Sequence, residues 1–103
     1  MSNIEKNPNF DGNPDDAEHI EWDDGNLREF EAHQISVEEV HDALSNPVTR
    51  VPNTNYGSNR WKVLGITNGG RKLTVIVEYD SRRRLLRPIT GWDSSKGEVS
   101  KYF

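Results

Sequence analysis

The sequence predicts a small α+β domain in which two N-terminal helices pack on an antiparallel sheet of about four strands, followed by a short C-terminal helix. Two observations support this prediction. Apolar residues in the first half recur at helical intervals of three and four, whereas from Val48 onward they alternate as in strands. The chain has 103 residues, which is the size of one domain and too short for two cores.

Several classes of protein are excluded by what the sequence lacks. It has no cysteine, which excludes disulfides and thiolate chemistry. It contains no Gly-x-Ser-x-Gly motif, no phosphate-cradling glycine loop and no cofactor fingerprint. Its longest apolar-rich stretch, residues 73–77, is far shorter than the roughly 20 residues of a membrane helix, and the N-terminus lacks a signal-peptide pattern. We therefore expect a cytoplasmic protein with no cofactor and no membrane partner.

Charge is distributed unevenly along the chain. The formal net charge is -4, which as a total argues against binding to nucleic acid. Residues 1–49 nevertheless carry 13 acidic and 2 basic side chains, whereas residues 50–103 carry 4 acidic and 11 basic ones. This asymmetry predicts a basic working surface in the second half.

Residues 1–19 have the composition of a disordered acidic tail, and residues 20–103 form the predicted domain. The tail is rich in Asn, Asp, Gly and Pro, and Ile4 and Phe10 are its only large apolar side chains. It is either a solvated leader or an acidic arm that mimics nucleic acid or docks a basic partner.

Order begins with a short strand over residues 19–22, where polar and apolar residues alternate. Asp23, Asp24 and Asn26 are suited to cap a helix that extends over residues 26–33.

The second helix has clearer signals. Ser36 followed by Glu39 fits a capping box, and Ile35 and Val40 are spaced as a hydrophobic staple. Asn46-Pro47 ends this helix.

The strand-like runs that follow are separated by short turns, which makes their pairing antiparallel. They cover residues 48–51 at a sheet edge, then, after a loop over 52–57, residues 60–67, 72–80 and 84–92. Ser94 or Ser95 caps a last helix through Glu98 to Tyr102. Strict alternation puts Arg60 and Lys62 on one face and separates Arg87 from Thr90. The helices cover one face of this sheet, so we expect the other face to be free to bind something.

Six short motifs occur in a distinctive order. They are Glu21-Trp22-Asp23; Ser36-Val-Glu-Glu-Val40 with Asn46-Pro47; Arg60 before Gly65; Gly-Gly-Arg71 before a strand ending in Tyr79; Arg87 before Ile89-Thr90-Gly91; and Glu98 before Tyr102. Over residues 20–103 this order and spacing resembles the family of BrnT-type toxins. The resemblance implies a RelE-like fold and a bacterial type II toxin, a ribonuclease held in check by a DNA-binding antitoxin.

The chain departs from the family pattern at two places. The family ends its last strand in Ser-Ala-Arg, where this chain has Thr90-Gly91-Trp92, and it has a Lys-His-Gly turn where this chain has Ala32-His33-Gln34. Each departure removes a basic residue. If those positions are catalytic in the family, the protein has weakened or lost catalysis.

Metal-independent cleavage of RNA needs a proton acceptor, a proton donor and positive charge beside the phosphate. Arg60 and Arg87 are the candidates for the charge, since a guanidinium binds phosphate oxygens bidentately and the family pattern includes both. The alternative is an ordinary sheet arginine paired with Glu78 or Asp80.

Three further residues could move protons. Tyr102 could donate a proton or stack on a base, or else anchor the core. Glu98, one turn earlier, could act as a base, hold Arg87 or be solvated. His33 suits acid-base chemistry near neutral pH, or it caps the end of its helix.

Basic residues around these candidates are expected to bind RNA. They are Lys62, Arg82, Arg83, Arg84 and Lys101, with a soluble turn as the alternative for the three arginines. Trp61 is expected in the core, whereas Trp92 fits either the core or an exposed stacking position. His19 and His41 lack partners at metal-ligand spacing, so we expect no metal site.

These residues give two hypotheses that follow the resemblance, and a third in which the protein is an adaptor unrelated to toxins. In the first, the protein is a toxin that cleaves RNA and inhibits translation, with an antitoxin of the ribbon-helix-helix type as its partner and a homodimer within their complex. In the second, the same fold has lost catalysis and binds an antitoxin-like partner or RNA.

Overall fold

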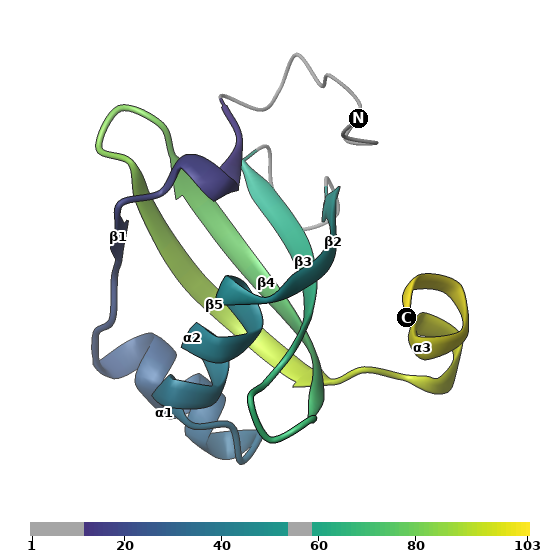
Figure 1. The fold of residues 1–103 in the computed structure, drawn as a ribbon. Coiled ribbons are helices and arrows are strands. Elements are labelled where there is room, and N and C mark those ends of the chain that lie inside the picture. Colours follow the sequence, from purple (N-terminus) through teal and green to yellow (C-terminus); the bar gives the residue numbers. More distant parts are fainter. Residues whose placement is uncertain (1–11, 54–58) are drawn as a thin grey trace.

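The computed structural model, described here for residues 12–53 and 59–103, is an α+β domain built on one five-stranded sheet (Figure 1). The strand order is β1-β5-β4-β3-β2. The elements are η1 (Pro14–Asp16), β1 (His19–Ile20), α1 (Asp24–Ala32), α2 (Val37–Ser45), β2 (Pro47–Pro52), β3 (Arg60–Ile66), β4 (Lys72–Asp80), β5 (Leu85–Asp93) and α3 (Lys96–Tyr102). Among the described residues, no helix is long and apolar enough to cross a membrane.

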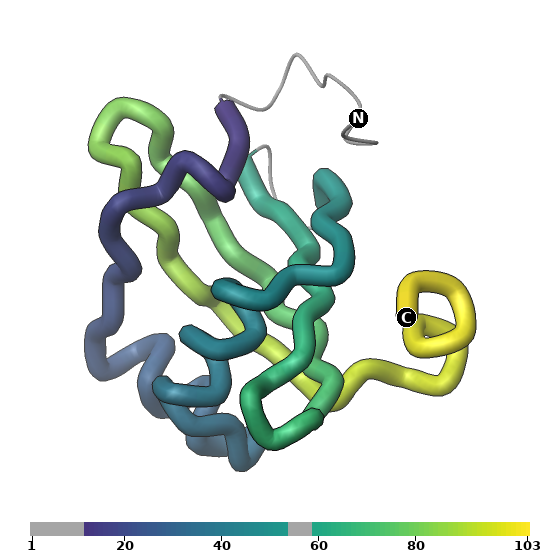
Figure 2. Tube along the Cα trace, in the orientation of Figure 1, coloured from purple at the N-terminus to yellow at the C-terminus, as the bar shows by residue number. Residues whose placement is uncertain are grey.

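The N-terminal segment of residues 14–23, which we call the strap, is part of the domain. η1 is followed by β1, which pairs with β5 in parallel, and the backbone N–H groups of Glu18 and His19 both donate to the Arg84 carbonyl. Figure 2 shows this segment beside the turn between β4 and β5. For residues 12–19 the prediction of a disordered tail is therefore wrong, and the sheet has a fifth, parallel strand; residues 1–11 lie outside the described residues.

The two helices begin where their capping signals predict. Asp23 caps α1 by accepting from the N–H groups of Gly25 and Asn26, and the Asn26 side chain accepts from the Asp23 N–H. Ser36 and Glu39 form the predicted capping box of α2. Both helices pack on the same face of the sheet, which we call the inner face.

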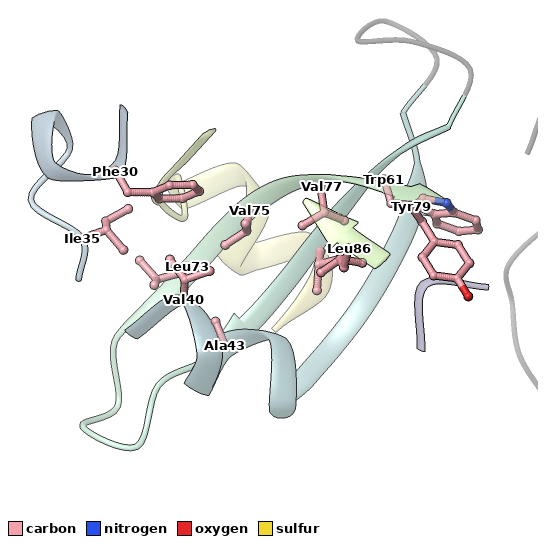
Figure 3. Packing of buried hydrophobic residues seen from close by; sticks show 11 residues of the cluster. Phe30, Ile35, Val40, Ala43, Trp61, Leu73, Val75, Val77, Tyr79 and Leu86 are labelled. Atoms are coloured by element: carbon pink, nitrogen blue, oxygen red, sulfur yellow. The ribbon is translucent and has the colours of Figure 1, made fainter. Parts of the chain in front are cut away.

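The core lies between the inner face and these helices. Its buried residues are Phe30, Ile35, Val40, Ala43, Trp61, Val63, Leu73, Val75, Val77, Tyr79 and Leu86. Figure 3 shows Phe30 and Ile35 at one end of this cluster and Trp61 and Tyr79 at the other. Trp61 thus has its predicted place in the core. Gly65 lets α2 approach β3 closely, because a Cβ there would lie 2.0 Å from the Ala43 carbonyl oxygen.

The strands of the meander are confirmed within one or two residues of their predicted bounds, and β2 lies at the predicted edge. A bulge in β5 overturns the strict alternation. Arg87 lies opposite Glu78 and Thr90 lies opposite Ile76, so Ile89 is the extra residue. Thr90 therefore lies on the same face as Arg87, whereas strict alternation predicted opposite faces. Of the predicted loop, residues 54–57 lie outside the described residues.

The second face of the sheet, which we call the outer face, is not free. α3 begins at Ser95, one of its two predicted caps, and is bound to this face through Glu98, which contacts Lys62 of β3 and Thr74 of β4. Leu64 and Ile76 on the same face are fully buried. The expectation of an uncovered face failed because the sequence signals of α3 mark its start but not where the helix docks.

Candidate nucleic-acid interface

Two of the predicted arginines lie in one row across the outer face. In the strand register, Arg60 of β3 is opposite Glu78 of β4, and Glu78 is opposite Arg87 of β5. Neighbouring strands are about 4.8 Å apart, so the two arginine backbones are about 10 Å apart. The sheet therefore brings Arg60 and Arg87 to the same end of one face.

Both arginines are held by carboxylates. Arg60 Nε donates to Glu78 Oε2 at 3.0 Å, with a quarter of the Arg60 side chain exposed. Arg87 Nη2 donates to Asp23 Oδ1 at 3.1 Å, and its Nη1 lies 3.5 Å from Glu21 Oε1. The hydrogen bond from Arg87, with the backbone N–H of Asn26, lowers the pKa of Asp23 to about 2. The same pair raises the pKa of Arg87.

Glu98 is the centre of a hydrogen-bonded group on the outer face, which we call the Glu98 cluster. Its Oε2 lies 2.8 Å from Lys62 Nζ, and its Oε1 accepts from Thr74 Oγ1, Trp92 Nε1 and the backbone N–H of Ser95. Burial by itself raises the pKa of Glu98, but these donors outweigh it and lower the pKa to about 2. A carboxylate in this setting stays ionised with its oxygens occupied, so it is poorly suited to carry protons at neutral pH.

The Glu98 cluster also places Trp92. Its indole N–H donates to Glu98 at 3.0 Å, and its side chain is half-buried. Trp92 therefore lies neither in the inner core nor in a fully exposed stacking position, which were the two alternatives. Its indole holds α3 to β5 instead.

Tyr102 is the last residue of α3, one helical turn after Glu98, and is half-buried. Lys101 is exposed, and its Nζ lies 5.2 Å from the centre of the Tyr102 ring. Both residues therefore belong to the helix that the Glu98 cluster holds on the outer face.

His33 does not join this group. It follows α1, and its Nε2 lies 3.2 Å from Glu29 Oε2 in an exposed pair. Glu29 also accepts from Thr90 Oγ1 of β5 at 2.7 Å, so His33 lies near β5 and has its contact with Glu29 rather than with Glu98 or Lys62. His33 occupies the C-cap position of α1, as the structural alternative predicts, but its side chain is directed to Glu29.

The three consecutive arginines form the turn between β4 and β5. Arg83 Nε donates to Asp80 at 2.9 Å, which lowers the pKa of Asp80 and raises that of Arg83, and Arg84 Nη1 donates to Glu18 of the strap at 3.0 Å. The Arg82 side chain is exposed. A hollow of about 420 Å³ beside this turn is lined by Asn59, Glu78, Tyr79, Asp80, Ser81 and Arg82.

Sequence reasoning missed how thoroughly the acidic half neutralises the basic half. Asp15, Glu18, Glu21 and Asp23 of the strap pair with arginines of β2, β5 and the turn before β5, and Glu39 of α2 pairs with Arg71. The opposite charges of the two halves were the available signal. The predicted basic surface is therefore a surface of ion pairs.

Arg71 joins three parts of the fold. The sequence analysis used it only as part of a turn motif and did not predict these contacts. It donates to the Gln34 carbonyl at 2.9 Å, to Glu39 at 3.1 Å and to Asp93 at 2.6 Å. The hydrogen bond with Asp93 is the main reason that the pKa of Arg71 is raised. Arg71 therefore binds the turn between the helices to both the start of α2 and the end of β5.

The described residues include no group of three or more His, Cys, Asp or Glu side chains that could hold a metal ion. His41 accepts a hydrogen bond from Trp22 Nε1 at 2.9 Å, and the two rings are stacked.

Comparison with known proteins finds no protein-family model and no curated protein that matches the chain.

Proposed function

We propose that the protein is the toxin of a type II toxin–antitoxin pair, a RelE-like, metal-independent endoribonuclease that acts on RNA in the cytoplasm and so inhibits translation. The observation that carries the proposal is the row of Arg60, Glu78 and Arg87 across the outer face. Two guanidinium groups at one end of a rigid sheet, on the face that also carries α3 and its tyrosine, match the needs of phosphodiester cleavage. The resemblance of residues 20–103 to BrnT-type toxins points to the same reaction.

In this proposal Arg60 and Arg87 bind the scissile phosphate and stabilise the charge that develops on it. The RNA 2′-hydroxyl oxygen attacks phosphorus, its proton passes to water, and the bond from phosphorus to the 5′-oxygen breaks. Tyr102 donates a proton to that leaving 5′-oxygen and is reprotonated from water. The products are a 2′,3′-cyclic phosphate and a 5′-hydroxyl.

The other predicted residues take supporting roles. Glu98 positions α3 and therefore Tyr102, because its oxygens are already occupied by Lys62, Thr74 and Trp92. Lys62, Lys101 and the arginines of the turn before β5 attract the RNA backbone. His33 has no step in this proposal, because its side chain is paired with Glu29 at the end of α1.

The proposed protein partner is an antitoxin of the ribbon-helix-helix class that inhibits the toxin, within a complex that holds a toxin homodimer. Its coding sequence is expected beside that of this chain.

A second function, binding without cleavage, is favoured by one specific observation. Glu98 is held as an anion by four donors, and the two arginines of the row are both paired with carboxylates. A site in this state can bind a partner or RNA by exchanging ion pairs, but it has fewer groups that are ready to transfer protons. This is the inactive interaction module among the hypotheses above.

Expression in bacteria without a partner, together with an RNA cleavage assay on the purified protein, decides between the two functions. We expect growth arrest, and we expect Arg60→Ala and Arg87→Ala each to slow cleavage by about 100-fold, since each removes a charge from the transition state. Arg28→Ala is the matched control, because Arg28 is an exposed arginine on α1. Circular dichroism and urea unfolding verify that each variant is folded.

Normal growth together with RNA that stays intact would overturn the nuclease proposal. RNA binding that persists and depends on Arg60 and Arg87 would then establish the second function. Cleavage that is equally sensitive to Arg28→Ala would show that overall charge, rather than the row, matters.

A further inference from the structure

The strap places four carboxylates against three arginines, of which Arg84 and Arg87 lie at the candidate interface. Asp15 Oδ1 lies 2.6 Å from Arg50 Nε, and Glu18 Oε2 lies 3.0 Å from Arg84 Nη1. Glu21 and Asp23 both contact Arg87. Acidic groups within nine residues of chain thus neutralise three guanidinium groups that are distant in the sequence.

The backbone and apolar side chains of the strap hold it on the sheet. Ala17, Ile20 and Trp22 pack against the core, and the N–H groups of Glu18, His19 and Glu21 donate to the Arg84 and Leu86 carbonyls. Its acidic side chains are held less firmly. Arg84 and Glu18 are each more than half exposed. Exposed ion pairs are weak and are screened by salt, so another anion can compete for these arginines at modest cost.

Asp23 differs from the other three carboxylates of the strap. It caps α1, and its pKa is lowered to about 2 by Arg87 and by backbone N–H groups. We therefore expect the Asp23 carboxylate to stay in place while the carboxylates of Glu18 and Glu21 exchange between their arginines and solvent.

We infer that the strap is a built-in competitor of RNA: the carboxylates of Glu18 and Glu21 occupy positions on Arg84 and Arg87 that phosphates of a single-stranded RNA would otherwise take. This inference rests on the proposed function, since it names the regulation of the same face. The uneven charge of the sequence did not say where the acidic side chains lie. The structure places those of Glu18 and Glu21 on Arg84 and Arg87. RNA binding then requires these two carboxylates to leave the arginines, while the strap backbone stays on the sheet.

The test measures polyanion binding by the double variant Glu18→Gln and Glu21→Gln. Its matched control is Glu31→Gln with Glu38→Gln, which makes the same change in net charge at two exposed positions on α1 and α2. The probes are a short single-stranded RNA and heparin, each titrated from about 50 to about 200 mM salt. Urea unfolding of each protein verifies that the fold is kept.

We expect the strap variant to bind both probes about three- to tenfold more tightly than the control variant at the lowest salt. We also expect its log–log salt slope for RNA to steepen by about 0.7 for each arginine that becomes available. Equal affinities for the two double variants would overturn the inference, whether both bind tightly or neither binds.

The same proteins separate this inference from the proposed function. The competitor inference is judged by the difference in binding between the two double variants, with heparin as a probe that needs no catalysis. The nuclease proposal is judged by cleavage and by its loss in Arg60→Ala. A strap variant that binds more tightly but cleaves nothing would support the inference and refute the nuclease.

Discussion

The two faces of the sheet are built from the same three long strands but are stabilised in different ways. On the inner face, Val63, Val75 and Val77 are buried in the apolar core beneath α1 and α2. On the outer face, Arg60, Lys62 and Glu78 lie in ion pairs that remain partly exposed. Apolar contacts cannot be replaced by a ligand without unfolding, whereas ion pairs can be exchanged for a charged ligand.

This contrast indicates that the outer face is the one suited to bind a ligand. The inner face fixes the strands rigidly, and that rigidity gives the row of Arg60, Glu78 and Arg87 a defined spacing on the outer face. Substitutions on the inner face should therefore change stability first, while those on the outer face should change binding and pH dependence first.

Gly65 offers the largest expected effect, on the inner face. A Cβ at this position would lie 2.0 Å from the Ala43 carbonyl oxygen, so Gly65→Ala must push α2 away from β3. We expect a loss of about 3 kcal/mol or more in the free energy of unfolding, measured in urea. Gly69→Ala is the control, because its Cβ would meet only Thr67 Oγ1 at 3.8 Å, and it should change stability by less than about 0.5 kcal/mol. Similar losses in both variants would contradict the close approach of α2.

Glu98 offers an intermediate effect, on the outer face. Its pKa falls from 4.5 to about 2 on folding, so its charge stabilises the protein fully above pH 4.5, and this contribution is lost as the pH falls toward 2. Since 12% of its side chain is exposed, the shift corresponds to on the order of 3 kcal/mol. We expect Glu98→Gln to lower stability by about 1–3 kcal/mol at pH 7 and by much less near pH 2.

Urea unfolding of the parent protein and of Glu98→Gln across this range of pH measures that difference. Glu31→Gln, on exposed α1 surface, makes the same chemical change and should cost less than about 0.5 kcal/mol. A difference between parent and Glu98→Gln that does not vary with pH would mean that Glu98 does not hold α3 through its charge.

Glu18 offers the smallest effect on stability. Its pair with Arg84 is more than half exposed on both sides, so Glu18→Gln should change the free energy of unfolding by less than about 0.5 kcal/mol. This result would sharpen the contrast between the faces, because the same residue is expected to alter RNA binding. A loss as large as that of Gly65→Ala would show instead that the pair of Glu18 with Arg84 is needed for folding.

Local signals in the sequence predicted most elements of the fold. Asp23, Ser36 and Ser95 mark helix starts, and short turns fix the antiparallel meander, because both effects depend on a few neighbouring residues. The parallel pairing of β1 with β5 was missed, since its partners Ile20 and Leu86 lie far apart in the sequence. The docking of α3 was missed for the same reason.

The candidate site was predictable in part. Alternation along each strand gave Arg60 and Lys62 a common face, but the bulge at Ile89 shifted the end of β5, and its one signal, the preceding Pro88, was not used. The carboxylate partners were the larger gap. Glu78, Glu98 and Asp23 acquire their roles only when the sheet and the strap bring them to Lys62, Arg60 and Arg87.

We propose that the outer face, and not the inner face covered by α1 and α2, is the working surface. Titration of the isotopically labelled protein with a short single-stranded RNA, followed by two-dimensional NMR of the backbone amides, tests it most directly. We expect shifts concentrated at Arg60, Lys62 and Arg87 and in the strap, with α2 unchanged. Shifts centred on α1 and α2, with the outer face unchanged, would contradict it.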